Sequence, residues 1–210
     1  MDNQLVFVTG ISTEVGKTFL SAVITEALEA DYWKPIQAGE LEFSDKDTVQ
    51  SLVSNSKSKF YPIQYELNTP MSPHAAAEID GVTIDIDSLH IPKTANKLVI
   101  EGAGGLLVPL NNHDTILDII PKNAKVIVVS RHYLGSINHT LMTLELLKIN
   151  GFQPGIIFNG DEHPTTESII ASKSDCFVIG RVGNESEVNV STVKKLSKQL
   201  KNSLLSFLSV

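Results

Sequence analysis

The feature that most constrains this chain is a short loop with a glycine near each end, Gly10-Ile-Ser-Thr-Glu-Val-Gly-Lys-Thr18. The apolar residues Leu5 to Val8 before it indicate a buried strand. After it, apolar residues recur every three or four positions from Phe19 to Leu28, which predicts a helix. A glycine loop between a strand and a helix gathers backbone N–H groups at a helix N-terminus, where they bind an anion. The segment therefore predicts a phosphate-binding loop (P-loop).

Within this loop, Lys17 is expected to reach the β- and γ-phosphates of a nucleotide, and Thr18 to offer its hydroxyl to Mg²⁺. Five residues, Ile11 to Val15, separate the two glycines, whereas the usual P-loop has four. The alternative is an ordinary strand–turn–helix connection in which Gly-Lys-Thr occurs by chance. The strand and helix that flank the loop favour the phosphate-binding interpretation.

Short β-branched segments alternate with helical patterns along the rest of the chain, which is typical of parallel strands covered by helices. Further strands are predicted at 32–33, 97–100, 125–129, 155–158 and 176–179. Residues 39–96 give a mixed signal, with short helices at 47–53 and 74–79, and we interpret them as an elaborated connection above the sheet. We predict an α/β fold: a single P-loop domain over residues 1–210, with a mostly parallel central sheet covered by helices on both faces.

The segment 192–208 predicts an amphipathic helix with lysines opposite an apolar stripe formed by Val193, Leu196, Leu200, Leu204 and Phe207. A basic amphipathic helix can bind a membrane surface. The alternative, that the stripe docks onto the core of the same domain, is the one we expect.

Composition excludes several classes of protein. A formal net charge of −7 argues against a nucleic-acid binder, which needs a basic face. The apolar runs are too short to span a bilayer, and the segment from Met1 to Gly10 lacks the basic and apolar regions of a signal peptide. Cys176 stands alone and the histidines show no metal-site spacing, so neither a disulfide nor a zinc site is expected. We expect a cytoplasmic protein that binds neither nucleic acid nor membrane.

Together with the loop, four segments resemble the dethiobiotin synthetase family in the same order: Lys34-Pro-Ile-Gln-Ala-Gly39, Ser72-Pro-His-Ala-Ala-Ala-Glu78, Glu101-Gly-Ala-Gly-Gly-Leu-Leu-Val-Pro-Leu110 and Leu134-Gly-Ser-Ile-Asn-His-Thr140. The longer spacing of Gly-x-x-Thr-Glu-Val-Gly-Lys-Thr is itself similar to that family's loop. The resemblance implies a homodimeric ligase of biotin biosynthesis. Such an enzyme uses ATP and Mg²⁺ to convert 7,8-diaminononanoate and CO₂ to dethiobiotin, giving ADP and phosphate.

The resemblance also implies the catalytic residues, which are Thr13, Lys17 and Lys34. Lys34 is expected at the end of the second strand, on the carboxyl edge of the sheet that carries the loop. A lone lysine is usually a solvated surface residue, and the pattern by itself does not exclude that alternative.

Three oxygen ligands for Mg²⁺ are implied, from Thr18, Asp47 and Glu101. Asp45 competes with Asp47 for this role, and Asp47 can instead be a carboxylate that interacts with the dipole at a helix N-terminus. Glu101 ends an apolar strand, and its alternative is a charge at a strand end that lies in solvent.

The nucleotide contacts implied by the resemblance come from four stretches: Glu14, Val15, Gly16, Lys17, Thr18 and Phe19; Gly102, Ala103 and Gly104; Asn159 and Gly160; and Gly183, Asn184 and Glu185. Val182-Gly183 stands where many members of the family carry Ile-Pro, and Glu187 is an alternative ribose contact. From the pattern alone, Asn159 can equally be a turn residue.

The substrate contacts implied are Ala38, where the family often has Ser or Thr, and Gly135, Ser136 and Asn138. The helix that starts at Gly135 to Asn138 would bind the substrate carboxylate through its backbone N–H groups, across the dimer interface. Ser136 can also be a plain helix N-cap, and we take His74 and His139 as structural.

Two other functions are compatible with a P-loop. A switch or partitioning ATPase usually carries an additional lysine early in the loop, where this chain has Ile11 and Ser12. A non-catalytic nucleotide-sensing domain is disfavoured because Lys17, Thr18 and Glu101 are all present.

Overall fold

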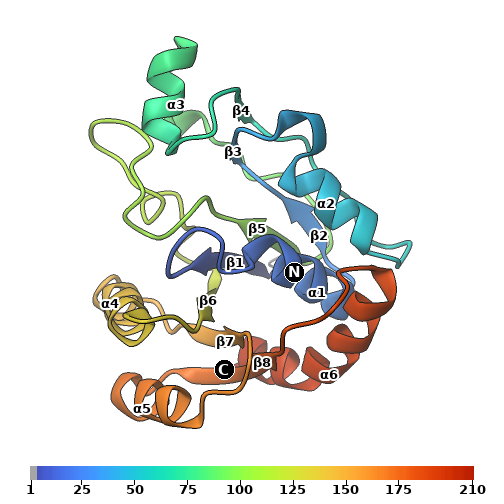
Figure 1. Ribbon diagram of the computed structural model, residues 1–210. Coiled ribbons are helices and arrows are strands. Elements are labelled where there is room, and N and C mark those ends of the chain that lie inside the picture. The colour runs from blue at the N-terminus through green and yellow to red at the C-terminus, as the bar shows by residue number, and fades with distance from the viewer. Residues whose placement is uncertain (1–3) are drawn as a thin grey trace.

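The central sheet of the computed structural model, which describes residues 4–210, has six parallel strands in the order β2-β5-β1-β6-β7-β8 (Figure 1). Residues 1–3 belong to the segment considered above for a signal peptide and lie outside the described residues. The strands are β1 (Leu5–Gly10), β2 (Asp31–Trp33), β5 (Leu98–Glu101), β6 (Lys125–Arg131), β7 (Gly155–Asn159) and β8 (Phe177–Val182). All six predicted strands are confirmed, and so is the α/β class with its parallel sheet.

Helices cover both faces of this sheet (Figure 1). One face carries α1 (Lys17–Leu28) and α6 (Val190–Ser209), and the other carries α4 (Ser136–Ile149) and α5 (Pro164–Ser174). The predicted apolar stripe of α6 is buried, which confirms that this helix docks onto the core. Within residues 4–210, no helix combines the length and the apolar character needed to cross a membrane.

The connection between β2 and β5 lies above the sheet and is more elaborate than the sequence indicated (Figure 1). It contains β3 (Ile36–Ala38) and β4 (Tyr65–Leu67), which form a separate two-stranded parallel sheet. The two predicted helices are confirmed as α2 (Asp45–Leu52) and α3 (Pro73–Asp80), beside the short 3-10 helices η1 (Leu41–Phe43) and η2 (Ile86–Ser88). The sequence analysis missed β3, β4 and α5, because three-residue strands show no periodicity and α5 buries few apolar side chains.

Strand register brings the candidate residues to one edge of the sheet. β1 is buried along its whole length between β5 and β6, with Val8 opposite Glu101 and Gly10 opposite Val129. Because all strands are parallel, their carboxyl ends meet at the same edge. The loop after β1 and the ends of β2, β5 and β7 therefore lie together.

Candidate active site

The loop after β1 has a backbone conformation that its glycines make possible. Gly16 has φ +92°, and a Cβ at this position would lie 2.2 Å from Nδ2 of Asn159. Glu14 has φ +56°, a left-handed conformation that is rare without glycine. Among residues 4–210, no side chain caps the start of α1, so the first N–H groups of this helix are open to an anion.

Lys17, the first residue of α1, is buried, and its Nζ donates a hydrogen bond to the Ser12 carbonyl at 2.9 Å. Burial, together with the positive charge of nearby Lys34, lowers the pKa of Lys17 to about 8. A bound phosphate would favour the charged form of this ammonium group, because an opposite charge close by raises a lysine pKa. The site thus presents a partly desolvated cation that lacks a carboxylate partner of its own within residues 4–210.

Four side chains form what we call the polar cluster: Thr18, Lys34, Asp45 and Glu101. The Thr18 hydroxyl lies 2.9 Å from Asp45 Oδ1 and 3.0 Å from Glu101 Oε1. The Lys34 ammonium lies 2.6 Å from Asp45 Oδ2 and 3.2 Å from Glu101 Oε1. A hydroxyl carries one proton and donates to one acceptor at a time, so the carboxylate oxygens around Thr18 outnumber its donors. That excess of oxygen acceptors fits a hard divalent cation.

Glu101 is fully buried, so the interpretation that it is a solvated charge at a strand end is wrong. Its second oxygen accepts a hydrogen bond of 2.9 Å from the Tyr32 hydroxyl. Burial and the negative charge of Glu101 raise the pKa of Tyr32 well above its ordinary value, so the phenol stays protonated and donates. The sequence analysis missed Tyr32, whose signal was its place in β2, two residues before Lys34.

Lys34 is only 3% exposed, which rules out the solvated alternative for this lysine. Burial by itself would lower the pKa of Lys34, but the carboxylates of Glu101 and Asp45 raise it above its ordinary value. The ammonium also donates to the Gly102 carbonyl at 3.2 Å. Lys34 is therefore a charged group fixed in position on three sides.

The structure brings Asp45, and not Asp47, to Thr18 and Glu101. Asp47 accepts hydrogen bonds from the backbone N–H and the hydroxyl of Ser44 at 3.0 and 2.6 Å, closing a capping box at the start of α2. These bonds from Ser44 lower the pKa of Asp47. Two residues along a helix correspond to a rotation of about 200°, so the carboxylates of Asp45 and Asp47 point in opposite directions.

A divalent ion at the polar cluster would need ligands other than carboxylates. Within residues 4–210, no group of three His, Cys, Asp or Glu side chains is arranged to hold a metal ion. Thr18, Asp45 and Glu101 together supply three protein oxygens, and phosphate oxygens and water would complete an octahedron. This donor set fits Mg²⁺ bound together with a nucleotide.

The glycine-rich segment after Glu101 runs against the P-loop. A Cβ on Gly102 would lie 3.1 Å from the Phe7 ring, and a Cβ on Gly105 would lie 3.3 Å from the Gly10 carbonyl. Gly104 has φ +67°, and the half-buried Ala103 precedes it. This close approach requires small residues, which explains the run of glycines.

On the other side of the loop, the ends of β7 and β8 face each other. Asn159 Nδ2 donates to the Val15 carbonyl at 2.8 Å, and the N–H of Gly160 donates to the Val182 carbonyl at 2.8 Å. The side chain of Asn184 lies 3.9 Å from the position of a Cβ on Gly160. Asn159, Gly160 and Asn184 thus gather beside the loop, with Gly183 directly after β8.

Glu185, expected near the nucleotide, and Glu187, the alternative ribose contact, both interact with residues at or near the start of α6. Glu185 pairs with Lys195 of α6 at 3.2 Å. Glu187 accepts a hydrogen bond of 3.0 Å from the side chain of Asn189, and Asn189 is the N-cap of α6. Phe19, also expected at the nucleotide, is partly buried against the hydrophobic core.

The start of α4 differs from the expected N-cap. Gly135, with φ +101°, is the N-cap residue, and Ser136 is the first helical residue and is buried. The N-cap interpretation of Ser136 is therefore wrong, because the left-handed turn at Gly135 already starts the helix. Asn138 is exposed and donates to the Met142 sulfur at 3.3 Å.

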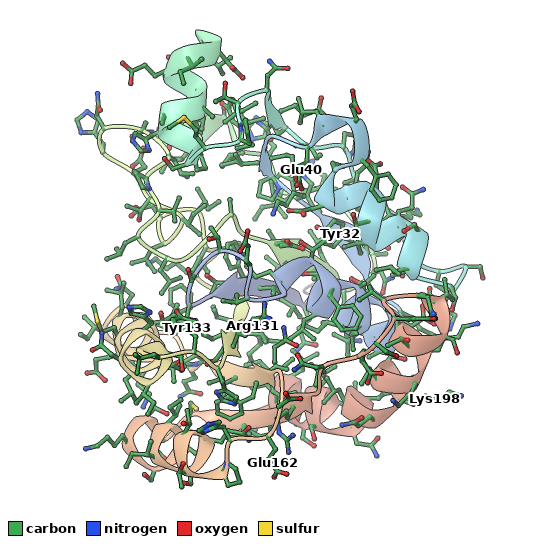
Figure 2. All side chains as sticks on the ribbon, viewed as in Figure 1. Tyr32, Glu40, Arg131, Tyr133, Glu162 and Lys198 are labelled. Atoms are coloured by element: carbon green, nitrogen blue, oxygen red, sulfur yellow. The ribbon has the colours of Figure 1, made fainter. Side chains whose placement is uncertain are left out.

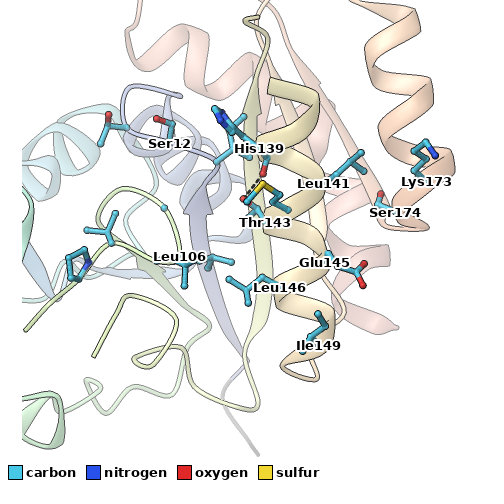
Figure 3. Close-up of a pocket in the computed structure, with 17 residues that line it drawn as sticks. Ser12, Leu106, His139, Leu141, Thr143, Glu145, Leu146, Ile149, Lys173 and Ser174 are labelled. Carbon is cyan, nitrogen blue, oxygen red and sulfur yellow. Dashed lines mark hydrogen bonds between the residues drawn. The ribbon is translucent and has the colours of Figure 1, made fainter. Parts of the chain in front are cut away.

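A cleft of about 980 Å³ lies between α4 and the loops after β1 and β5 (Figure 3). Ser12 and Thr13 form its wall on the P-loop side, and Leu106 and Pro109 form the wall opposite α4. His139 also lines it, whereas Ala38, half-buried at the end of β3, does not. The lining is predominantly apolar, so the cleft suits an aliphatic ligand that reaches the phosphate loop.

Known structures share this fold. A Borrelia burgdorferi B31 protein assigned to plasmid partition, bound to AMPPNP, is 12% identical with a TM-score of 0.59 over 99% of both chains. The MinC:MinD cell division protein complex of Aquifex aeolicus gives 13% identity and a TM-score of 0.52, covering 98% of this chain and 94% of that chain. At these identities the likeness shows the P-loop fold alone.

Sequence comparisons are more specific. The family model described as an AAA domain matches residues 4–192. The ATP-dependent dethiobiotin synthetase BioD of Christiangramia forsetii is 55% identical, over 94% of this chain and 96% of that protein. The enzyme of the same name from Cytophaga hutchinsonii is 45% identical, over 92% and 95%. With its P-loop and polar cluster at one sheet edge, the chain belongs to the ATP-dependent dethiobiotin synthetase family, and is an ATP-dependent ligase of biotin biosynthesis.

Proposed function

We propose that this protein carboxylates 7,8-diaminononanoate with CO₂ and closes the ring to dethiobiotin, a cyclic urea, while converting ATP to ADP and phosphate. The observation that carries this proposal is the Lys34 ammonium, which is buried between Asp45 and Glu101 beside the first turn of α1. It is a charged group fixed beside the P-loop, where it can act on a γ-phosphate and an attacking oxygen together.

In this reaction one amine of the diamine first combines with CO₂ and loses a proton, giving a carbamate. A carbamate oxygen then attacks the γ-phosphorus of ATP, and the bond from that phosphorus to the bridging oxygen breaks, releasing ADP. The second amine attacks the carbamate carbon, loses a proton and expels phosphate, which closes the ring. Phosphoryl transfer of this kind depends on positioning and charge neutralisation rather than on a protein nucleophile.

The P-loop and the polar cluster divide these tasks. Lys17 and the N–H groups at the start of α1 hold the phosphates, and Lys34 stabilises the charge shared between carbamate and γ-phosphate. Thr18, Asp45 and Glu101 would hold Mg²⁺, with Asp45 in the role first expected of Asp47. When bound, Mg²⁺ would neutralise charge on the β- and γ-phosphates.

The substrate is proposed to occupy the apolar cleft. Its carbon chain matches the aliphatic lining, and Thr13 lies where the cleft meets the P-loop. The backbone N–H groups of Ile137 and Asn138, in the first turn of α4, donate no hydrogen bond within residues 4–210. Such open N–H groups at a helix start suit the substrate carboxylate.

A homodimer is proposed because the surface around α4 exposes apolar side chains. Leu134, in the loop before α4, is fully exposed, and Met142 and Ile149 of α4 are 60% and 74% exposed. Leu107, across the cleft, is 63% exposed. An apolar patch of this kind on a soluble enzyme marks an interaction site, and a second copy would place each α4 start at its partner's cleft. The cytoplasmic location stays a prediction.

The proposed function is tested by phosphate release from ATP with diaminononanoate and bicarbonate, each omitted in turn. We expect one cyclic urea per phosphate and little release when either is missing. ATP hydrolysis that proceeds at the same rate without the diamine would instead identify a switch or partitioning ATPase.

A further inference from the structure

Arg131 ends β6 with an exposed guanidinium group that reaches the P-loop. Its Nη1 donates a hydrogen bond to the backbone carbonyl of Glu14 at 3.1 Å. Figure 2 shows Arg131 beside the loop that follows β1. Nothing in the reaction described above uses this residue.

The neighbouring strand makes an equivalent contact. Arg131 and Asn159 are register partners at the ends of β6 and β7. Asn159 Nδ2 donates to the carbonyl of Val15 at 2.8 Å, while Arg131 donates to the carbonyl of Glu14. Two consecutive loop carbonyls are therefore held by two adjacent strand ends.

Holding these carbonyls orients the N–H groups that bind phosphate. In a planar trans peptide, the C=O and the N–H point in opposite directions. The Glu14 carbonyl shares its peptide unit with the N–H of Val15, and the Val15 carbonyl shares its own with the N–H of Gly16. Within residues 4–210, neither of these two N–H groups donates a hydrogen bond, so both remain open to an anion.

The loop segment from Glu14 to Gly16 has a strained backbone. Glu14, at φ +56°, and Gly16, at φ +92°, both have left-handed backbone conformations on either side of Val15. A left-handed backbone is unfavourable for a residue other than glycine and persists only where surrounding contacts fix it. The Glu14 side chain is exposed and forms no hydrogen bond within residues 4–210, so its conformation is held through its backbone.

We propose that Arg131 is a positioning residue for nucleotide binding: its hydrogen bond to the Glu14 carbonyl aims the N–H of Val15 at a nucleotide phosphate. The inference rests on the proposed function only in taking a nucleotide polyphosphate as the ligand. It requires that Arg131 act by orienting the loop. Neither a contact with the nucleotide base nor the charge of the guanidinium group alone would be enough.

The test compares Arg131→Met with Arg131→Lys and with the control Lys125→Met, which removes a positive charge from the other end of β6. Calorimetry measures the dissociation constants of ATP and of inorganic tripolyphosphate, both with Mg²⁺. We expect Arg131→Met to bind both ligands about tenfold more weakly, the size of effect that one lost hydrogen bond produces. Arg131→Lys should recover most of the affinity, because its ammonium can donate to the same carbonyl, and Lys125→Met should bind normally.

Three results would overturn the assignment. Unchanged affinity for both ligands would show that the hydrogen bond does not matter. A loss confined to ATP would indicate a contact with the base, and a loss that disappears in about 1 M salt, where charges act over only about 3 Å, would indicate simple attraction.

A second variant, Arg131→Gln, is too short to reach the carbonyl and gives the same comparison if Arg131→Met does not fold. Should the natural chain bind both ligands as expected but make no dethiobiotin, the proposed function fails and the assignment of Arg131 stands. The two proposals therefore fail separately.

Discussion

The polar cluster and the cleft lie next to each other but differ in how complete they are within one chain. Thr18 of α1, Lys34 directly after β2 and Glu101 of β5 are far apart in sequence, and their polar atoms already lie within 3.2 Å of a partner. Along the cleft, Met142 and Ile149 of α4 are 60% and 74% exposed. One chain therefore orders the phosphate side of the site by itself, whereas the substrate side leaves apolar surface uncovered.

The difference follows from the physical character of the two regions. The charges of the polar cluster are paired and hydrogen-bonded within one chain, because an unpaired buried charge is very costly. Exposed apolar surface costs much less and can be covered later by another copy of the chain. Substitutions should therefore affect chemistry and folding in the cluster, and assembly and substrate binding at the cleft.

The largest effect is expected for Lys34→Gln. Loss of one preorganised electrostatic donor typically lowers the rate by about 10²–10³, so turnover should fall by that factor with a smaller change in the KM for ATP. Steady-state kinetics of Lys34→Gln beside Lys17→Gln measure this, and Lys17→Gln should weaken ATP binding more. Near-normal turnover in Lys34→Gln would remove Lys34 from catalysis.

Because Lys34 is buried between two carboxylates, this variant also needs a control for folding. Lys34→Gln leaves Glu101 without its cation, so it should be less stable in denaturant than the natural chain. Adding Glu101→Gln should restore part of that stability but none of the turnover.

The next effect separates two aspartates of α2. Asp45→Asn should lose most of the Mg²⁺-dependent stabilisation by ATP, which is about 2.7 kcal/mol for a ligand at about 100 times its dissociation constant. Asp47→Asn should keep that dependence and lose only about 1 kcal/mol without ligand, as is usual for a helix cap. Thermal unfolding with ATP, with and without Mg²⁺, measures both. If the two variants exchanged their behaviour, Asp47 would be the metal ligand.

In the loop before α4, Leu134→Asp should weaken the proposed dimer by about 2 kcal/mol, the size of effect seen at interface hot spots. Diamine-dependent turnover should fall with it, while ATP binding stays normal because the polar cluster is complete in one chain. Sedimentation equilibrium measures the association. Leu205→Asp, at an exposed apolar position on α6 across the sheet, is the matched control. Equal association in both variants would place the interface elsewhere.

The smallest effect lies outside both regions, at Glu26 of α1. Burial by itself would raise the pKa of Glu26, but hydrogen bonds from Ser54 and Asn55 lower it below its ordinary value. Because the pKa of Glu26 is lower in the folded state, its charged carboxylate stabilises the fold at pH values above the ordinary pKa of 4.5. This stability is lost as the pH falls through the folded-state pKa.

Glu26→Gln should therefore lower the free energy of unfolding by about 1 kcal/mol at neutral pH, a modest figure because the carboxylate is largely solvated. The difference from the natural chain should shrink as the pH drops below 4.5. Urea unfolding at several pH values measures it, and turnover should stay normal. A difference that is constant with pH would mean that the carboxylate charge is not involved.

Much of the fold could be predicted because its signals are local. The strands are continuous apolar segments bounded by turns, and the P-loop depends on glycines and a helix start that are adjacent in sequence. Glu101 could be placed at the sheet edge because parallel strands end together. The small sheet of β3 and β4 could not be predicted, since each strand has three residues and depends on its partner.

The sequence by itself determined which residues can bind phosphate and on which edge of the sheet they lie, because strand and loop signals depend on neighbours along the chain. Only the tertiary structure decided that Asp45 rather than Asp47 meets Thr18, because a rotation of about 200° separates their side chains and the helix start sets which one faces inward. It also decided that Lys34 is buried and that Arg131 reaches the Glu14 carbonyl. These contacts join residues far apart in sequence, and their burial and direction depend on packing that no local pattern contains.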